Sequence, residues 1–143
     1  MRFFVLSVFL FAGISLSVYS QKTHNVIDIS KNDFITKVMD YEKNLDKWSY
    51  KGKKPCVIYF YADWCVPCRK ITPLMEELSV TYKDQVIFYK VDSDKERELS
   101  RSLKVSSIPT LIFVPVKGDP KITREAISKS VFESAVYDLL SDK

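Results

Sequence analysis

The chain has 143 residues, and its 22 lysine and arginine residues against 18 aspartate and glutamate residues give a formal net charge of +4 at pH 7. The charges are interspersed, and the longest basic tract, at 51–54, is best interpreted as a solvated turn, so the composition gives little support to nucleic-acid binding. Gly52 and Gly118 are the only glycines after position 20, which excludes a glycine-rich phosphate-binding loop, and three cysteines are too few for a densely disulfide-bonded small domain.

Residues 1–20 have the layout of a secretory signal peptide. Arg2 precedes an uncharged apolar run at 3–18, and small residues occur near the end of the segment at Ser17 and Ser20. A charged start, an apolar middle and a small-residue exit are the three parts that such a peptide needs. We therefore expect an exported protein, periplasmic or secreted, in a compartment where disulfide bonds persist.

Cleavage of this leader is predicted before Gln21, with a cut after Ser17 as the alternative. Removal of residues 1–20 leaves one domain at 21–143, which is long enough to bury a core. An uncleaved membrane anchor is the less favoured interpretation, because an apolar run of about 16 residues falls short of the roughly 20 that a spanning helix needs.

The first elements after the leader are predicted to be a short strand and a helix. Residues 26–30 alternate between apolar and polar side chains, which is typical of a strand. A helix is predicted through 34–45, because apolar residues recur there at three- and four-residue steps. Its apolar face consists of Phe34, Val38, Tyr41 and Leu45, and its start could be capped by Ser30, Asn32 or Asp33. A polar loop follows at 48–55.

Two strands and two helices are predicted in the middle of the chain. Residues 56–62 form an uninterrupted β-branched and aromatic run, which favours a strand buried on both faces. A helix is predicted over 65–83, with a kink at Pro73. A near-continuous apolar run at 85–92 predicts a second central strand, and the charged segment 94–105 predicts a short helix.

The last part of the chain is predicted to be a hairpin and a helix. A strand at 108–116 is followed by a turn and an alternating partner at 121–126, and Pro115 and Pro120 place this hairpin toward the edge of the sheet. Residues 128–140 are amphipathic and predict a final helix. Strands that alternate with helices predict an α/β fold, with a parallel sheet covered on both sides and antiparallel strands added by the hairpin.

Two of the three cysteines, Cys65 and Cys68, lie where the strand at 56–62 meets the following helix. The free N–H groups at a helix start favour a thiolate at the first cysteine, and a thiolate is the form that attacks a disulfide. Cys68 lies nearly one turn further on and more inward, where it can reach the sulfur of Cys65 while shielded from solvent. We therefore interpret Cys65 as the nucleophile and Cys68 as the resolving thiol, which together close a Cys65–Cys68 disulfide.

Other uses of a cysteine pair fit this sequence less well. Haem attachment needs a histidine directly after the second cysteine, where the chain has Arg69. Structural zinc needs about four ligands, and only Cys56 and His24, without metal-like spacing, could supplement the pair. A static disulfide across so short a loop would restrict the unfolded chain little. We therefore expect no metal and no cofactor.

The sequence WCVPC at 64–68 between a strand and a helix, with Pro73 and the IPT segment at 108–110 downstream, resembles the thioredoxin family. The resemblance extends from Val26 to Leu140. It implies a thioredoxin fold, in which a central mixed five-stranded sheet is flanked by four helices.

The resemblance also implies roles for residues around the cysteines. Pro109 would follow a cis peptide bond and expose the backbone of Ile108, so that a substrate segment pairs with it like an added strand. Without the motif, a trans proline at the start of a strand is the ordinary interpretation. Trp64 would flank the site as an exposed aromatic residue rather than a core one. Val66 replaces the commoner glycine, and the retained Pro67 resembles the reducing members.

Two positions depart from the family pattern near the site. Thioredoxins usually have a buried aspartate at the position of Tyr59, and this aspartate moves the proton of the resolving thiol. Lys90 occupies the position of the lysine that pairs with that aspartate in the family. Either the Tyr59 hydroxyl or an ordered water relays the proton with help from Lys90, or Tyr59 only fills the space. Glu125 lies near the position of a glycine that is common in the substrate groove of the family, where it would narrow the groove or select basic partners.

The third cysteine, Cys56, is expected to be a small buried apolar residue, with a regulatory thiol as the alternative.

The expected function is that of a thiol–disulfide oxidoreductase that reduces or exchanges disulfides in exported proteins. Its electrons would come from a membrane donor, as the family implies, and it would act as a monomer. One alternative is a disulfide oxidase or isomerase, which would have a more oxidising potential. The other is a redox-inactive binding subunit, which would keep its function when Cys65 and Cys68 are replaced.

Overall fold

The computed structural model describes residues 24–141, so the predicted signal peptide and its cleavage site lie outside the described residues. This part contains five strands and four helices in the predicted order. None of these helices has both the length and the apolar character that crossing a lipid bilayer requires. The elements are β1 (Val26–Asp28), α1 (Lys31–Lys37), β2 (Cys56–Tyr61), α2 (Cys68–Thr81), β3 (Ile87–Asp92), α3 (Arg97–Ser102), β4 (Thr110–Val114), β5 (Lys121–Thr123) and α4 (Lys129–Ser141).

The five strands form one mixed sheet in the order β1-β3-β2-β4-β5. Strands β1, β3 and β2 are parallel, and β4 and β5 are added antiparallel. Tyr61 at the end of β2 is paired with Asp92 at the end of β3, and Phe60 is paired with Thr110 at the start of β4. The loops after β2 and β3 therefore meet the segment before β4 at one end of the sheet. The expected α/β fold with five mixed strands and four helices is confirmed.

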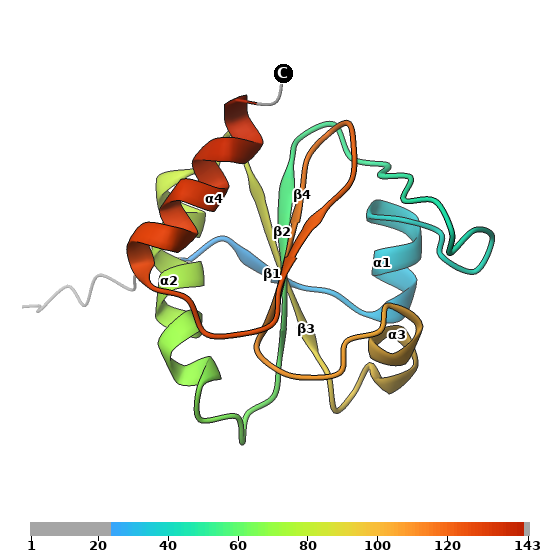
Figure 1. The fold of residues 1–143 in the computed structure, drawn as a ribbon, viewed down its shortest axis with the longest axis horizontal. Helices are drawn as coiled ribbons and strands as arrows, with labels where there is room; N and C mark the ends of the chain where they lie inside the picture. The colour runs from blue at the N-terminus through green and yellow to red at the C-terminus, as the bar shows by residue number, and fades with distance from the viewer. Residues whose placement is uncertain (1–23, 142–143) are drawn as a thin grey trace, which may run out of the picture.

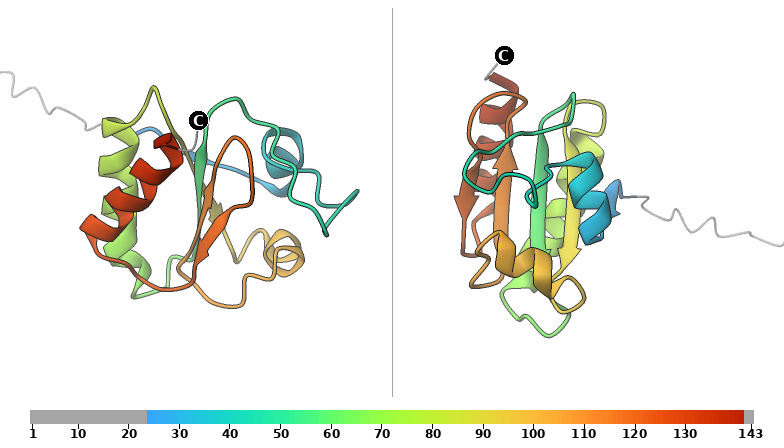
Figure 2. Two further views of the ribbon diagram at one scale, coloured as in Figure 1. Left: turned by 45° about the horizontal axis from the view of Figure 1, so that its top comes forward. Right: turned by 90° about the vertical axis from the view of Figure 1, so that its right-hand side faces the viewer.

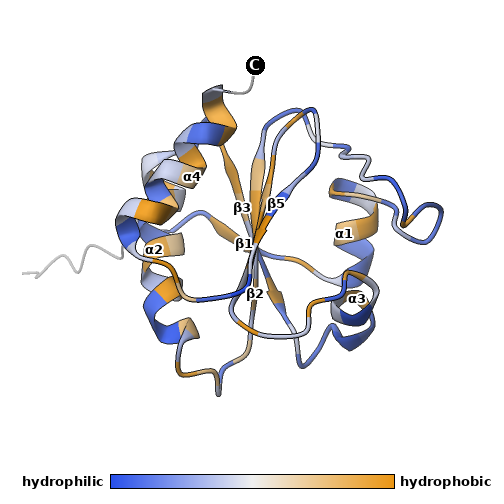
Figure 3. Cartoon of the chain, viewed as in Figure 1, coloured by the Kyte–Doolittle hydropathy of each residue, from blue (hydrophilic) through white to orange (hydrophobic). Residues whose placement is uncertain are grey.

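The sheet separates two layers of helices. Helices α2 and α4 cover one face, and α1 and α3 cover the other (Figure 1), and the same layers are seen from two further directions in Figure 2. Val57 and Tyr59 of β2 contribute to the buried cluster on the α2 side, whereas Ile58 and Phe60 contribute to the cluster on the α1 side. Apolar residues are accordingly concentrated in the strands (Figure 3). The prediction that β2 is buried on both faces is therefore confirmed.

The first predicted helix is shorter than its apolar spacing indicates. Helix α1 ends at Lys37, and the chain then folds back so that the N–H of Lys51 donates to the carbonyl of Val38 at 2.9 Å. Tyr41 is buried by this loop, whereas Leu45 is 59% exposed. The loop thus buries Tyr41, which the pattern assigned to a longer helix, but leaves Leu45 exposed, and the helix predicted through 34–45 is wrong beyond its first turns.

The terminal hairpin lies at one edge of the sheet, as its prolines predicted, but both of its strands are shorter than expected. Thr110 begins β4, after its hydroxyl has closed a turn by donating to the carbonyl of Ser107 at 2.6 Å. Strand β5 ends at Thr123, which pairs with Leu111, the second residue of β4. Beyond this pair, β4 has only one more residue with which β5 could continue to pair. Of the three candidate caps of α1, Ser30 is the one that the structure uses.

Candidate active site

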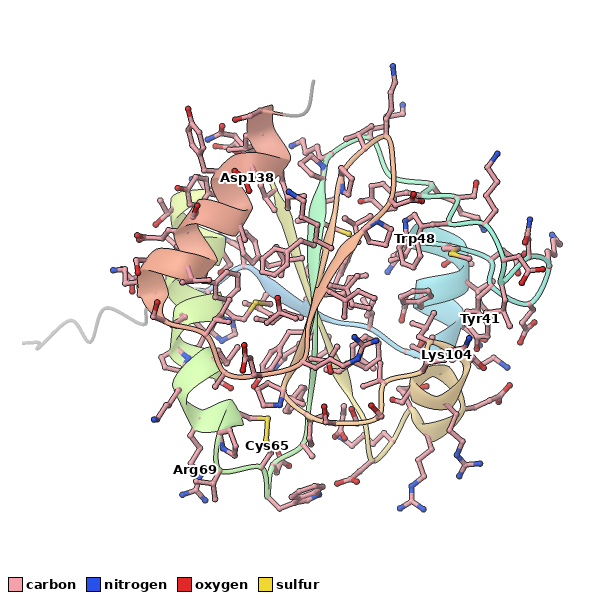
Figure 4. The ribbon with its side chains drawn as sticks, viewed as in Figure 1. Tyr41, Trp48, Cys65, Arg69, Lys104 and Asp138 are labelled. Carbon is pink, nitrogen blue, oxygen red and sulfur yellow. A yellow bond between two sulfur atoms is a disulfide. The ribbon has the colours of Figure 1, made fainter. Side chains whose placement is uncertain are left out.

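A disulfide bond joins Cys65 and Cys68 at the point where β2 gives way to α2 (Figure 4). The Cα atoms of the two cysteines are 5.3 Å apart. Helix α2 begins at Cys68 and not at Cys65, so the start of the predicted helix is corrected by three residues. The N–H of Cys68 donates to the Sγ of Cys65 at 3.3 Å. An N–H group at the start of the helix thus points at the first cysteine and favours negative charge on its sulfur.

The exposure of the two cysteines differs from the expectation. Each residue is only 3% exposed, so the prediction of an accessible Cys65 and a shielded Cys68 is wrong for this disulfide form. Both cysteines nevertheless line an open groove of about 400 Å³. The two cysteines differ in their position in the chain rather than in their exposure. Cys65 lies in the turn between Trp64 and Val66, each 67% exposed, whereas Cys68 lies in the first turn of α2.

Trp64 lies at the surface beside the cysteine pair and is held by Asp94. Its indole Nε1 donates to Oδ2 of Asp94 at 2.8 Å, so it is not a core tryptophan. Asp94 follows β3, and the parallel pairing of β2 with β3 brings the two loops to the same end of the sheet. The sequence offers no local pattern that would have identified Asp94. Val66 and Pro67 are also exposed, and Pro67 is the N-cap residue of α2 rather than part of its first turn.

The segment before β4 lies at the same end of the sheet as the cysteines. The Ile108–Pro109 peptide bond is cis, as the resemblance implied. Pro109 is buried and Ile108 is partly exposed, with its side chain packed against both buried clusters, one of which contains Cys65 and Cys68. The structure therefore brings together the two segments that the sequence singled out separately.

Tyr59 is buried behind the cysteine pair with its hydroxyl beside the start of α2. The hydroxyl lies 3.1 Å from the carbonyl oxygen of Cys68, to which it donates, and 3.2 Å from Oγ1 of Thr72. Burial raises the pKa of Tyr59, so the phenol is protonated at neutral pH. Tyr59 therefore contributes a hydrogen bond and does not act as a base. Thr72, four residues after Cys68 on the same helix face, was missed by the sequence analysis.

Lys90 does not hydrogen-bond to Tyr59. Its Nζ lies 3.3 Å from Oδ2 of Asp28 and 5.5 Å from the centroid of the Tyr61 ring. Tyr61 in turn stacks on Tyr59, with ring centroids 5.5 Å apart. Lys90 is the register partner of Tyr59 across β2 and β3, but its ammonium pairs with Asp28, so the structure shows no direct Tyr59–Lys90 relay.

Cys56 and His24 do not join the cysteine pair. Cys56 starts β2, at the end of the strand opposite to Cys65, and burial raises the pKa of its thiol to about 12. Its position is that of a small buried apolar residue. His24 Nε2 lies 4.0 Å from Oε1 of Glu76. Among residues 24–141, no three His, Cys, Asp or Glu side chains are grouped closely enough to hold a metal ion.

Glu125 is exposed and lies two residues beyond the end of β5. The pairing of Thr123 with Leu111 puts this end of β5 beside the start of β4. Glu125 therefore belongs to the same end of the sheet as Pro109, where a charged side chain can meet a bound segment.

Comparisons with known proteins agree with this geometry. The family model described as Thioredoxin matches residues 26–138. The chain is 43% identical over 112 residues to the Thioredoxin of Borreliella burgdorferi, which covers 78% of this chain and 95% of that protein. It is 42% identical over 73 residues to Thioredoxin-2 of Saccharomyces cerevisiae, covering 51% of this chain and 67% of that protein. It is 32% identical over 97 residues to the chloroplastic Thioredoxin-like protein CITRX of Arabidopsis thaliana, covering 68% of this chain and 51% of that protein.

Proposed function

Since the chain belongs to the thioredoxin family of thiol–disulfide oxidoreductases, we propose that it reduces or exchanges disulfide bonds in exported proteins. The observation that carries this proposal is the Cys65–Cys68 disulfide at the start of α2, with a helix N–H directed at the Cys65 sulfur. A pair in this position can cycle between disulfide and dithiol without any other redox group.

In the proposed cycle, Cys65 is the nucleophile and Cys68 the resolving thiol. The Cys65 thiolate attacks a substrate disulfide, forms a mixed disulfide and releases one substrate thiolate. The Cys68 thiolate then attacks Cys65, which releases the second substrate thiolate and closes the protein disulfide. The N–H of Cys68 stabilises the Cys65 thiolate in the reduced protein, because its 3.3 Å contact to that sulfur favours negative charge there.

The substrate is proposed to bind as an extended segment across the cysteine pair. The partly exposed Ile108 offers backbone groups beside the site, its side chain packs against the buried cluster that contains the cysteines, and the neighbouring Pro109 is buried. Trp64, Val66 and Pro67 supply exposed contact surface on the other side of the sulfurs. Pairing of backbone groups gives affinity for many sequences, which suits an enzyme with several protein substrates.

The location and the partners of the protein are further parts of this proposal. The layout of residues 1–20 supports export to the periplasm or the medium. A protein that reduces disulfides in such a compartment needs a supply of electrons, and we propose a membrane donor. The domain would act as a monomer, without nucleic acid and without a bound cofactor.

Reduction of insulin disulfides with dithiothreitol as electron source tests the activity. We expect turnover by the wild-type domain, no turnover by Cys65→Ser, and a trapped mixed disulfide with Cys68→Ser. Cys56→Ala is the matched control and should retain activity, because Cys56 is buried at the far end of β2. An inactive wild-type domain, or an active Cys65→Ser variant, contradicts the proposal and favours a binding subunit.

A redox titration of the same domain tests the direction of the reaction. A reductase should have a potential near the value of about −270 mV that is usual for thioredoxins, whereas an oxidase should lie near about −120 mV. A potential at the oxidising end of this range would assign the alternative function.

A further inference from the structure

An open groove beside the disulfide adjoins a smaller cavity, and the two spaces share lining residues. The open groove of about 400 Å³ is lined by both cysteines, and a smaller cavity of about 30 Å³ is lined by Tyr59 and Glu76. The smaller one has room for water, since a water molecule needs at least about 10–15 Å³ and two or more polar partners. Three residues line both spaces and so form the wall between them: Tyr61, Thr72 and Lys90.

Thr72 is the member of this wall whose hydroxyl contacts the backbone of Cys68, and it lines the groove together with Cys68. Its Oγ1 lies 3.1 Å from the carbonyl oxygen of Cys68 and 3.2 Å from the hydroxyl of Tyr59. A hydroxyl has one donor and two acceptor sites, so it can take a proton on one side while it releases another. Neither Thr72 nor the protonated phenol of Tyr59 is a base, so the route needs an acceptor beyond them.

Glu76 is the one carboxylate among the residues that line the smaller cavity. It follows Thr72 by four residues on α2, so both side chains lie on the same face of the helix. Its side chain is 45% exposed, which lets the carboxylate exchange protons with bulk solvent. Glu76 therefore combines access to the cavity with access to water outside.

We propose that the proton of the Cys68 thiol leaves through Thr72 and cavity water to the carboxylate of Glu76, in place of the buried aspartate that this chain lacks. The proposal rests on the proposed Cys65/Cys68 cycle. In the resolving step, the Cys68 S–H bond breaks, a Cys68–Cys65 S–S bond forms, and the bond between Cys65 and the substrate sulfur breaks. The substrate leaves as a thiolate and takes a proton from solvent. The protein dithiol is thereby oxidised to a disulfide, the substrate disulfide is reduced to two thiols, and Glu76 returns its proton to bulk water.

Several charged and titratable groups surround this route and act on it. Lys90 lines both the groove and the cavity, and its ammonium lies 3.3 Å from the carboxylate of Asp28. His24 approaches Glu76 at 4.0 Å from the segment before β1. The other such groups that face the two spaces are Tyr59 and Tyr61 of β2, Asp63 of the turn, and Arg69 of α2.

Single-turnover reaction of the reduced protein with Ellman's reagent separates the two chemical steps. Attack by Cys65 releases one thionitrobenzoate, and resolution by Cys68 releases a second. At neutral pH we expect Glu76→Gln to slow the second phase by about a hundredfold, the usual smaller contribution of a general base, and to leave the first phase unchanged. The slowing should shrink as the pH rises, because a thiol that is already ionised needs no base.

Matched variants separate this role from a structural one. Glu77→Gln removes the neighbouring carboxylate of the same helix, which pairs with Lys129, and should leave both phases unchanged. Thr72→Val should slow the second phase, and Thr72→Ser, which keeps the hydroxyl, should restore it. Equal second phases in Glu76→Gln and Glu77→Gln at every pH overturn the proposal, and equal rates for Thr72→Val and Thr72→Ser remove Thr72 from the route. A wild-type protein without a second phase contradicts the dithiol cycle itself, and the proton route with it.

Discussion

Replacement of Tyr59 by phenylalanine measures what one buried hydroxyl contributes at the site. The change leaves the ring in place, which is 1% exposed, so no cavity opens. The lost contacts are the donation to the carbonyl of Cys68 at 3.1 Å and the 3.2 Å contact with Thr72. The Thr72 hydroxyl still donates to that carbonyl at 3.1 Å. The free energy of unfolding should therefore fall by about 1 kcal/mol, the net value of one hydrogen bond, and not by the roughly 3 kcal/mol of an orphaned buried group.

Urea unfolding of the disulfide form measures this change. For a slope of about 1.5 kcal/mol per M, the midpoint of Tyr59→Phe should lie about 0.7 M below that of the wild type, with the slope unchanged. Tyr137→Phe is the matched control, because Tyr137 is 65% exposed on α4. The free energy of unfolding of this control should lie within about 0.5 kcal/mol of the wild-type value.

A double-mutant cycle tests whether the two hydroxyls act together. Tyr59→Phe and Thr72→Val should show a coupling energy of at least about 0.5 kcal/mol, because each hydroxyl loses a partner when the other is removed. A Tyr59→Phe protein as stable as the wild type, or a cycle without coupling, would refute the hydrogen-bonded arrangement.

Three further predictions address the core, the third cysteine and a helix start. Phe132→Ala removes a fully buried ring that meets another phenylalanine edge-on at 5.6 Å, and denaturant titration should show a loss of about 3–5 kcal/mol; a loss below about 1 kcal/mol would contradict this packing. Cys56 should resist iodoacetamide in the folded protein, since burial raises the pKa of its thiol to about 12 and keeps it protonated at neutral pH; mass spectrometry should find it modified only after unfolding, and modification as fast as that of free cysteine would be inconsistent with its burial. The ion pair with Lys37 and hydrogen bonds from Ser30 lower the pKa of Asp33, so its stabilisation is present above the ordinary value of about 3.9 and is lost as the pH falls through the lowered one. Asp33→Asn should therefore be less stable than the wild type at neutral pH, with a gap that narrows in urea titrations below about pH 4; a gap independent of pH would exclude a role for the charge.

The order of strands and helices could be predicted because its signals are local. The uninterrupted apolar run of β2 indicated burial on both faces, and β2 indeed contributes side chains to both clusters. Periodic apolar residues likewise identified α2 and α4. The length of α1 could not be predicted in this way, because the burial of Tyr41 depends on a loop that is closed by Lys51 thirteen positions after Val38.

The amino-acid sequence by itself indicated the chemistry of this protein: a cysteine pair at a predicted strand–helix junction, with no histidine directly after it and too few further ligands for zinc, favours disulfide exchange over haem or metal binding. Only the tertiary structure decided which groups serve these cysteines. Asp94 holds Trp64 and Lys90 pairs with Asp28 because strand pairing brings distant loops and strands to the same place. Such partners depend on register and packing between segments far apart in the chain, and no pattern of neighbouring residues encodes them.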